Sequence, residues 1–348
     1  MALLFMAGFD TGATFAELGM SQVGSVAITA SPYPRTGSYG LNMTQSTLGS
    51  AYVQRTLAAS VAGCGAGVAF KPAGGWAAGT TRPLSFYDSG GVLQGYVAIN
   101  GSNRLAIFRG DGTQLGADTT YTPGVGTYFQ VECYYEPNDA GGRAIMWING
   151  SGVAAVDYTG DTRNGGSANV QTVRINPGTV SGANHDAADD FYIYDTSGGM
   201  TYPQGDVAIY TMFPNGNGAS SQFLGSDGNS TDNYLMVDEN APGHDSDTTY
   251  VQSATTGQKD TYAMSNPSVA TGTVLGVKVA VNARKDVAGA GSLIIVTGLS
   301  GTEVDSATIS MSTAYATYLT GIQATKPGGG AWSIADLTAM EAGVKVGA

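Results

Sequence analysis

The stretch Met-Trp-Ile-Asn-Gly at residues 146–150 and the stretch Asp-Asp-Phe-Tyr-Ile-Tyr-Asp at residues 189–195 decide the fold class. Apolar and polar side chains alternate in both, which is typical of a β-strand with one buried face. Asn149-Gly150 is in addition a signal for a type I′ hairpin turn. Other short alternating segments surround them, separated by glycine-rich turns roughly every 8–12 residues. We therefore expect antiparallel β-sandwiches.

The composition also favours an all-β globular protein. Of the 348 residues, 52 are glycine, and 42% of the chain is hydrophobic whereas only 12% is charged. This apolar content is enough to offset the conformational entropy lost on folding, so we do not expect a disordered chain. The glycines follow no fixed period, which excludes a collagen-like repeat and indicates many tight turns.

The length of the chain predicts two domains, with a boundary near residues 202–205. We expect one β-sandwich in residues 1–203 and a second one, of jelly-roll type, in residues 204–348. The second domain should open with a strand at 206–214 and a loop at 215–218, and should contain a strand at 233–237.

One short helix is expected near the end of the chain, within residues 333–342. Ser333 is a suitable N-cap residue, and Asp336 lies near the position from which a capping box is completed. Gly343 should end this helix, and residues 344–346 could then return to a sheet edge.

The charge, the hydropathy and the cysteine content argue against a nucleic-acid-binding, a membrane-spanning and a disulfide-linked protein. A formal net charge of −12, without a basic stripe, argues against binding to nucleic acid. No segment approaches the ~20 apolar residues of a membrane span, and the first ten residues indicate a β-strand better than a signal peptide. Cys64 and Cys133 are the two cysteines, and we expect both to be free thiols that act as small core residues.

Several short sequence words, in this order, resemble those of tailed-bacteriophage virion proteins that have a laminin-G or concanavalin A-like first domain. In the first domain they are Phe-Asp at residues 9–10, Asp-Thr-Arg-Asn-Gly-Gly at 161–166 and the stretch at 189–195. In the second they are Gly-Asp-Val, Pro-Asn-Gly, Val-Asp-Glu, Asp-Thr-Thr-Tyr-Val and Ala-Arg-Lys-Asp, at residues 205–207, 214–216, 237–239, 247–251 and 283–286. The resemblance covers nearly the whole chain.

The resemblance implies a non-enzymatic structural protein on the virion surface, either a minor tail or fibre component or a capsid decoration. Its partners would be other virion proteins and further copies of itself, because repeated subunits usually form closed symmetric assemblies. It would be assembled in the host cytoplasm and released by lysis. The alternative is a tail adhesin that binds a receptor or glycan on the host surface, and a glycan-degrading enzyme is a third hypothesis.

Two kinds of binding site are candidates. Trp76, in a glycine-rich segment, is the best residue for stacking on a sugar, whereas one face of Trp147 should belong to the core. No cofactor is expected apart from calcium, which laminin-G sandwiches often hold with oxygen ligands. Its candidate ligands here are Asp186, Asp189 and Asp190, and the acidic segment at residues 243–247 is a second location.

Catalytic motifs are weak. Glycoside hydrolysis needs two carboxylates that face each other across a cleft, and the candidates on one strand face are Glu132 and Glu136. An ordinary role as strand acids is the competing interpretation for this pair. The histidines, His185 and His244, are each followed by Asp but have no nucleophile motif nearby. We therefore expect no catalytic residues.

Overall fold

The computed structural model describes residues 2–44, 49–74, 78–178, 185–197, 201–239 and 244–348. The chain forms two compact units, and neither is one continuous segment. The first comprises Met1–Phe9 and Gly19–Ile209, and the second comprises Asp10–Leu18 and Tyr210–Ala348. The main division thus follows residue 209 instead of 203, and an early segment groups with the later half. In the described residues, no helix is long and apolar enough to cross a membrane.

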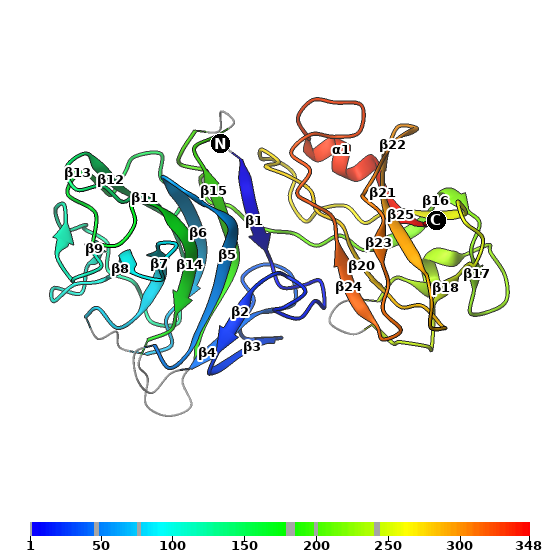
Figure 1. Ribbon diagram of the computed structural model, residues 1–348, viewed down its shortest axis with the longest axis horizontal. Helices are drawn as coiled ribbons and strands as arrows, with labels where there is room; N and C mark the ends of the chain where they lie inside the picture. The colour runs from blue at the N-terminus through cyan, green and yellow to red at the C-terminus, as the bar shows by residue number, and fades with distance from the viewer. Residues whose placement is uncertain (1, 45–48, 75–77, 179–184, 198–200, 240–243) are drawn as a thin grey trace. The chain divides into compact units, whose positions relative to one another are not determined.

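The first unit is a sandwich of two antiparallel sheets, as the alternating segments predict (Figure 1). The eight-stranded sheet has the order β13-β12-β11-β6-β15-β4-β3, and β1 also pairs with β15. Its strands are β1 (Leu3–Ala7), β3 (Ser25–Thr29), β4 (Gly40–Thr44), β6 (Cys64–Lys71), β11 (Phe129–Glu136), β12 (Gly142–Ile148), β13 (Val156–Gly160) and β15 (Asp186–Asp195).

The seven-stranded sheet has the order β10-β9-β8-β7-β14-β5-β2. Its strands are β2 (Ser21–Val23), β5 (Tyr52–Val61), β7 (Arg82–Tyr87), β8 (Leu93–Ile99), β9 (Leu105–Arg109), β10 (Gln114–Leu115) and β14 (Val170–Asn176). The core lies between the two sheets, where Phe86 of β7 stacks on Tyr135 of β11 with ring centroids 5.5 Å apart. Cys64 and Cys133 are buried free thiols, as expected.

Both of the defining stretches form strands. The first ends β12, and Asn149 and Gly150 follow it with φ values of 51° and 68°, as a type I′ turn requires. The second belongs to β15, which lies between β6 and β4 in the eight-stranded sheet and is buried over nearly its whole length. The prediction of strands here is confirmed.

The outer face of the eight-stranded sheet is covered by the residues that follow β15, which we call the connecting segment (residues 201–209). Tyr202 of this segment stacks on Tyr134 at 5.0 Å and contacts Trp147 at 5.3 Å. Trp147 is therefore almost completely buried. This part of the outer face of the eight-stranded sheet therefore does not meet solvent, but forms a second, smaller hydrophobic cluster with the connecting segment.

A buried carboxylate, that of Glu132 in β11, fixes the connecting segment on this face. Its oxygens accept hydrogen bonds from the hydroxyl of Tyr192 at 2.9 Å and from that of Tyr194 at 2.5 Å. The backbone N–H of Gln204 donates to both oxygens, at 3.0 and 2.8 Å. Burial raises the pKa of Glu132 above its usual value, and these hydrogen bonds oppose that shift.

Glycine makes the two tyrosines fit. Gly65 and Gly67 of β6 lie opposite Tyr194 and Tyr192 in the β6–β15 ladder. A Cβ atom at Gly65 would lie 2.0 Å from Cζ of Tyr194, and one at Gly67 would lie 2.2 Å from Cζ of Tyr192. The rings therefore lie flat across backbone that has no side chain, and this aims their hydroxyls at Glu132.

The second unit is built on a six-stranded antiparallel sheet with the order β16-β19-β25-β21-β22, in which β23 also pairs with β21. These strands are β16 (Pro214–Ser221), β19 (Lys259–Met264), β21 (Ser292–Leu299), β22 (Thr302–Asp305), β23 (Ile309–Ser310) and β25 (Met340–Val346). Two ribbons accompany the sheet: β17 (Leu224–Gly225) with β18 (Val251–Gln252), and β20 (Ala280–Ala283) with β24 (Ala316–Leu319). Val281 and Tyr318 of the second ribbon pack on the core around Ile295.

The expected helix is confirmed, but the expected helix end at Gly343 and the sheet edge after it are not. Helix α1 (Ile334–Ala339) has Ser333 as its N-cap, and Asp336 completes a capping box. The residues that follow form β25, which lies between β19 and β21 and is therefore an inner strand instead of an edge. Gly343 does not end the helix: it lies inside β25, where a Cβ would meet the carbonyl oxygen of Asp260 at 2.0 Å.

Three further expectations in the second unit are wrong. Residues 207–213 are not a strand, and side-chain oxygens of Asp190 and Ser265 accept the N–H groups of Ile209 at 2.7 Å and of Phe213 at 3.0 Å. The expected loop at 215–218 lies within β16, where Gly218 allows a close approach to Thr261. The expected strand at 233–237 is the 3₁₀-helix η2 (Asn233–Met236).

The early segment Asp10–Leu18 is tied to the second unit by a carboxylate. Oε1 of Glu17 accepts the backbone N–H of Thr317 in β24 at 2.5 Å, and Oε2 accepts the N–H of Thr14 at 2.7 Å. The second unit therefore includes a piece of chain that precedes almost the whole of the first.

Substituting Gly65 tests the packing of the tyrosines. We expect Gly65→Ala to lower the free energy of unfolding by about 1–3 kcal/mol, because the methyl group must displace the ring of Tyr194. Gly152→Ala is the matched control, since a Cβ there would have no atom within 4 Å. Urea unfolding followed by circular dichroism measures both variants. Equal midpoints for the two would contradict this account.

Substituting Glu132 tests the attachment of the connecting segment. Glu132→Ala leaves three buried donors without their acceptor, so we expect a loss of about 3 kcal/mol or more in urea unfolding. The pKa of Glu132 is raised in the folded state. The stability that this shift contributes is therefore fully present below pH 4.5 and is lost as the pH rises through the raised pKa. The stability of wild type relative to Glu132→Gln should therefore fall as the pH is raised above 4.5. A difference that does not change with pH would refute the assignment.

Candidate functional site

The predicted site residues do not come together as one site. Trp76 lies outside the described residues, so its role in stacking stays a prediction. Asp186 is buried, and its oxygens accept the backbone N–H groups of Ala73 at 2.8 Å and Gly178 at 2.5 Å. Asp186 therefore fixes Ala73 and Gly178 next to the start of β15.

Asp189 and Asp190 hold a different part of the first unit. Oδ2 of Asp189 accepts the backbone N–H groups of Arg35 at 2.8 Å and Thr36 at 3.1 Å. Asp190 pairs with the guanidinium of Arg35 at 3.0 Å and accepts the N–H of Ile209 at 2.7 Å. Both carboxylates are completely buried, and burial is the main cause that raises their pKa values.

This pair therefore fixes loops onto the sheet. Asp190 has a φ of 53°, and the β15–β6 register is irregular between Asp189 and Tyr192, which turns the two adjacent carboxylates toward different partners. Among the described residues, no group of three or more His, Cys, Asp or Glu side chains is placed to hold a metal ion. Asp186, Asp189 and Asp190 accept hydrogen bonds from donors of the protein itself, and calcium binding there or at residues 243–247 stays a prediction.

The carboxylates considered for catalysis also have partners within the fold. Glu132 has no exposed surface and is bound by the connecting segment, as described above. Glu136 accepts a hydrogen bond from the hydroxyl of Tyr134 at 3.1 Å. His185 packs edge-on to Tyr33 and contacts the hydroxyl of Thr44, whereas His244 lies against the ring of Tyr315.

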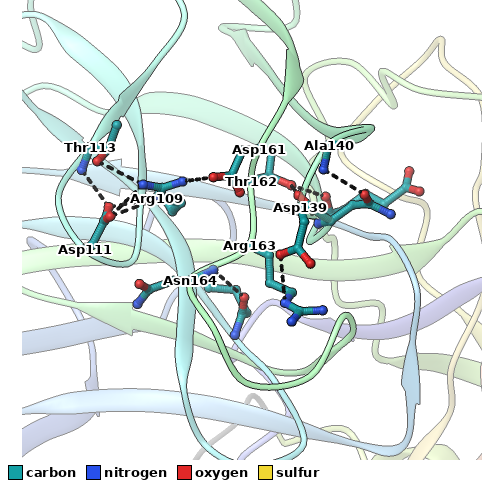
Figure 2. Close-up of polar contacts among 12 residues, drawn as sticks. Arg109, Asp111, Thr113, Asp139, Ala140, Asp161, Thr162, Arg163 and Asn164 are labelled. Atoms are coloured by element: carbon teal, nitrogen blue, oxygen red, sulfur yellow. Dashed lines mark hydrogen bonds and ion pairs between the residues drawn. The ribbon is translucent and has the colours of Figure 1, made fainter.

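Figure 2 shows the loop that contains the word Asp-Thr-Arg-Asn-Gly-Gly, which connects β13 to β14 and so joins the two sheets. Asp161 pairs with Arg109, which Asp111 also binds, at 2.8 Å. Oγ1 of Thr162 donates to the carbonyl of Glu136 at 2.6 Å. The amide of Asn164 donates to the carbonyl of Leu93 in β8 at 3.0 Å. This motif therefore has a structural role, because it links the two sheets of the first unit.

The outer face of the seven-stranded sheet has a different character. Strand register places one residue from each of five neighbouring strands in a single row: Gln54 of β5, Arg174 of β14, Ser85 of β7, Tyr96 of β8 and Phe108 of β9. The alternate residues of these strands, such as Val53, Val173 and Phe86, are completely buried in the core. The row must therefore lie on the face that points away from the core.

Two stacks of arginine and aromatic side chains occupy this face. In the first, the guanidinium of Arg174 lies over the rings of Tyr52, at 3.7 Å, and Tyr87, at 4.2 Å. In the second, the guanidinium of Arg82 lies 3.9 Å over Tyr96, whose ring stacks on Phe108 at 5.2 Å. We call this surface the arginine–tyrosine face.

Polar groups complete the arginine–tyrosine face. Oε1 of Gln54 accepts hydrogen bonds from Nε and Nη2 of Arg174, at 3.1 and 2.8 Å, and the hydroxyl of Tyr87 accepts one from Nη1 at 3.2 Å. Tyr52, Gln54, Tyr87, Arg82 and Arg174 all remain partly exposed. They combine ring faces, amide groups and guanidinium N–H groups on one surface that meets solvent.

Sequence reasoning did not identify this face. Arg174 of β14 pairs with Gln54 of β5 and Ser85 of β7, which lie far from it in the chain, so no local motif contains these residues together. The available signal was the polar half of each alternating strand, in particular the arginine in Val-Arg-Ile at residues 173–175. A charged side chain between two core positions indicated the outer face, but not its neighbours there.

A shallow depression of about 450 Å³ lies elsewhere on the first unit, lined by residues 118–121, 148, 149, 151 and 153–155. Its acidic group, Asp118, already accepts hydrogen bonds from the side-chain amides of Asn100 and Gln114, each at 2.7 Å. The depression offers fewer groups for recognition than the arginine–tyrosine face.

Comparison with known proteins gives matches among solved structures. No protein-family model and no curated protein matches the chain. The cellulose-induced protein Cip1 is 14% identical, with a TM-score of 0.43, over 57% of this chain and 100% of Cip1. Domain 4 of AbnA, an arabinanase from Geobacillus stearothermophilus in complex with arabinotriose, is 12% identical, with a TM-score of 0.38, over 56% of this chain and 92% of that domain. The carbohydrate-binding module CBM66 from Bacillus subtilis is 8% identical, with a TM-score of 0.32, over 51% and 96%.

Proposed function

We propose that the protein binds a saccharide on the arginine–tyrosine face of its first unit and acts by binding instead of by catalysis. The observation that supports this function is the row of side chains across β5, β14, β7, β8 and β9. Beside its partly exposed members, Gln54 and Arg174, lie the partly exposed rings of Tyr52 and Tyr87, whereas Ser85, Tyr96 and Phe108 are buried and support the face from below.

The chemistry of the face suits a sugar chain. A sugar ring offers an apolar C–H surface that packs on an aromatic ring, and hydroxyl groups that exchange hydrogen bonds with amides, hydroxyls and guanidinium groups. The partly exposed residues lie on the three neighbouring strands β5, β14 and β7, which are about 4.8 Å apart, so this part of the face extends over roughly 10 Å, about the length of two sugar units. The side chains are also fixed in place by their mutual stacking, which reduces the entropy lost on binding.

A place on a bacteriophage particle is a separate proposal, supported by the order of sequence words alone. Two of those words, at 161–166 and 189–195, have internal structural roles in the first unit. Proteins of this fold could therefore share these words for reasons of folding. Display of many copies on a particle would make weak saccharide binding effective through avidity. Mass spectrometry of purified particles from the source phage tests the location, and absence of the chain from them would refute it.

Binding to a panel of soluble polysaccharides, both neutral and acidic, tests the proposed function. We expect at least one polysaccharide to retard the full-length protein in affinity electrophoresis. Tyr52→Ala and Tyr87→Ala should each weaken this binding by about tenfold, because each removes a ring from the first stack.

Tyr210→Ala is the matched control, since Tyr210 is exposed and belongs to the second unit. Thermal unfolding of each variant establishes that the fold is retained. Failure of every polysaccharide to bind, or equal binding by wild type and both variants of the first stack, would refute the proposal.

A further inference from the structure

We propose that the bound saccharide is acidic, and that Arg174 and Arg82 receive its carboxylate or sulfate groups. This inference rests on the proposed function and specifies the ligand of the same face. The geometry that carries it is a pair of guanidinium groups on one sheet face, each held between neutral partners.

Arg174 is held rigidly, but its charge is not neutralised. The hydrogen-bond acceptors around it are the amide oxygen of Gln54 and the hydroxyl of Tyr87, and both are uncharged. The rings of Tyr52 and Tyr87 both lie against its guanidinium. A guanidinium has five N–H groups, of which these bonds use three, so two remain for a ligand among the contacts of the described residues.

Arg82 repeats the arrangement on the adjacent strand. Its guanidinium lies over Tyr96, and its Nε donates to the backbone carbonyl of Gly79 at 3.0 Å. Asn176 pairs with Arg82 and is two residues from Arg174 on β14, so the two arginines stand about 8 Å apart along and across the strands. Two charged groups of one polymer could therefore be bound together.

Five of the nine arginines are ion-paired in the structure, and Arg82 and Arg174 are among the four described arginines that are not; the other two are Arg55 and Arg104. The chain has 27 acidic residues for 15 basic ones, and Arg35, Arg109, Arg143, Arg163 and Arg284 each pair with an aspartate. In the part of the chain that the structure describes, no ion pair joins Arg82 or Arg174 to an acidic side chain. Partly buried positive charge without a counterion favours an anionic ligand, and the planar fork of arginine fits a carboxylate with two parallel hydrogen bonds.

The net charge of the protein makes this preference specific to the face. A formal charge of −12 repels a polyanion over most of the surface, so non-specific binding of an acidic polysaccharide is disfavoured. Binding of such a polymer would therefore report on a local site.

The test compares charged and uncharged polymers with the full-length protein. The probes are polygalacturonate, which carries carboxylates, dextran sulfate, which carries sulfates, and unmodified dextran and galactan, which are neutral. We expect binding to one or both acidic polymers and at least about tenfold weaker binding to the neutral ones. The two acidic polymers distinguish a carboxylate ligand from a sulfate ligand.

Substitution of Arg174 then assigns the preference to a residue. Arg174→Gln should weaken binding to the acidic polymer by at least about tenfold and should weaken binding to the neutral polymers much less, because only the acidic polymer loses an ionic contact. Arg174→Lys keeps the charge but loses the fork, so an intermediate loss is expected. Arg284→Gln is the control, because it removes the same charge from an exposed pair in the second unit. Thermal unfolding shows that each variant is folded.

The possible outcomes distinguish failure of the proposed saccharide binding from failure of the preference for an acidic ligand. If no polymer of either kind binds, the proposed function is wrong and this inference fails with it. If neutral polymers bind as well as acidic ones, or if Arg174→Gln and Arg284→Gln reduce acidic binding equally, the saccharide-binding function stands and the acidic preference is overturned.

Discussion

The arrangement of the first unit depends on the hydrogen bonds that the buried carboxylate of Glu132 accepts. Placing an acid inside a protein carries a cost in solvation that only well-directed donors can offset. Here the donors are two tyrosine hydroxyls, brought into place by glycines on the neighbouring strand, and one backbone N–H of the connecting segment. The outer face of the eight-stranded sheet is thereby closed, and the outer face of the seven-stranded sheet is the one that presents partly exposed rings and guanidinium groups.

Local patterns predicted the strands, turns and cap well, because these depend on neighbouring residues. The Asn149-Gly150 turn and the Ser333–Asp336 capping box are examples in which the required chemistry lies within a few residues. The errors in the second unit arose where distant groups decide the backbone. The N–H of Phe213 donates to the side chain of Ser265, while its carbonyl accepts the N–H of Ser265, and Gly343 permits close contact with Asp260 inside a sheet instead of ending a helix. Such contacts cannot be read from a window of sequence.

Contacts between distant residues also decide the candidate functional site. Asp186, Asp189 and Asp190 stood out in the sequence because acids are adjacent there, but the structure uses them to hold loops. The arginine–tyrosine face is dispersed over five strands, and its members are unremarkable one by one. Strand register, which the sequence does not contain in local form, is what assembles them.

The membership of Asp10–Leu18 in the second unit has a consequence for how the chain is divided in the laboratory. A fragment that begins at residue 204 or 210 would lack Glu17, and with it the acceptor for the N–H of Thr317 in β24. The chain passes from the first unit to the second, back again, and then to the second once more, so no single cut releases either half complete. Folding of the later half must in consequence recruit residues that are synthesised before almost all of the first unit.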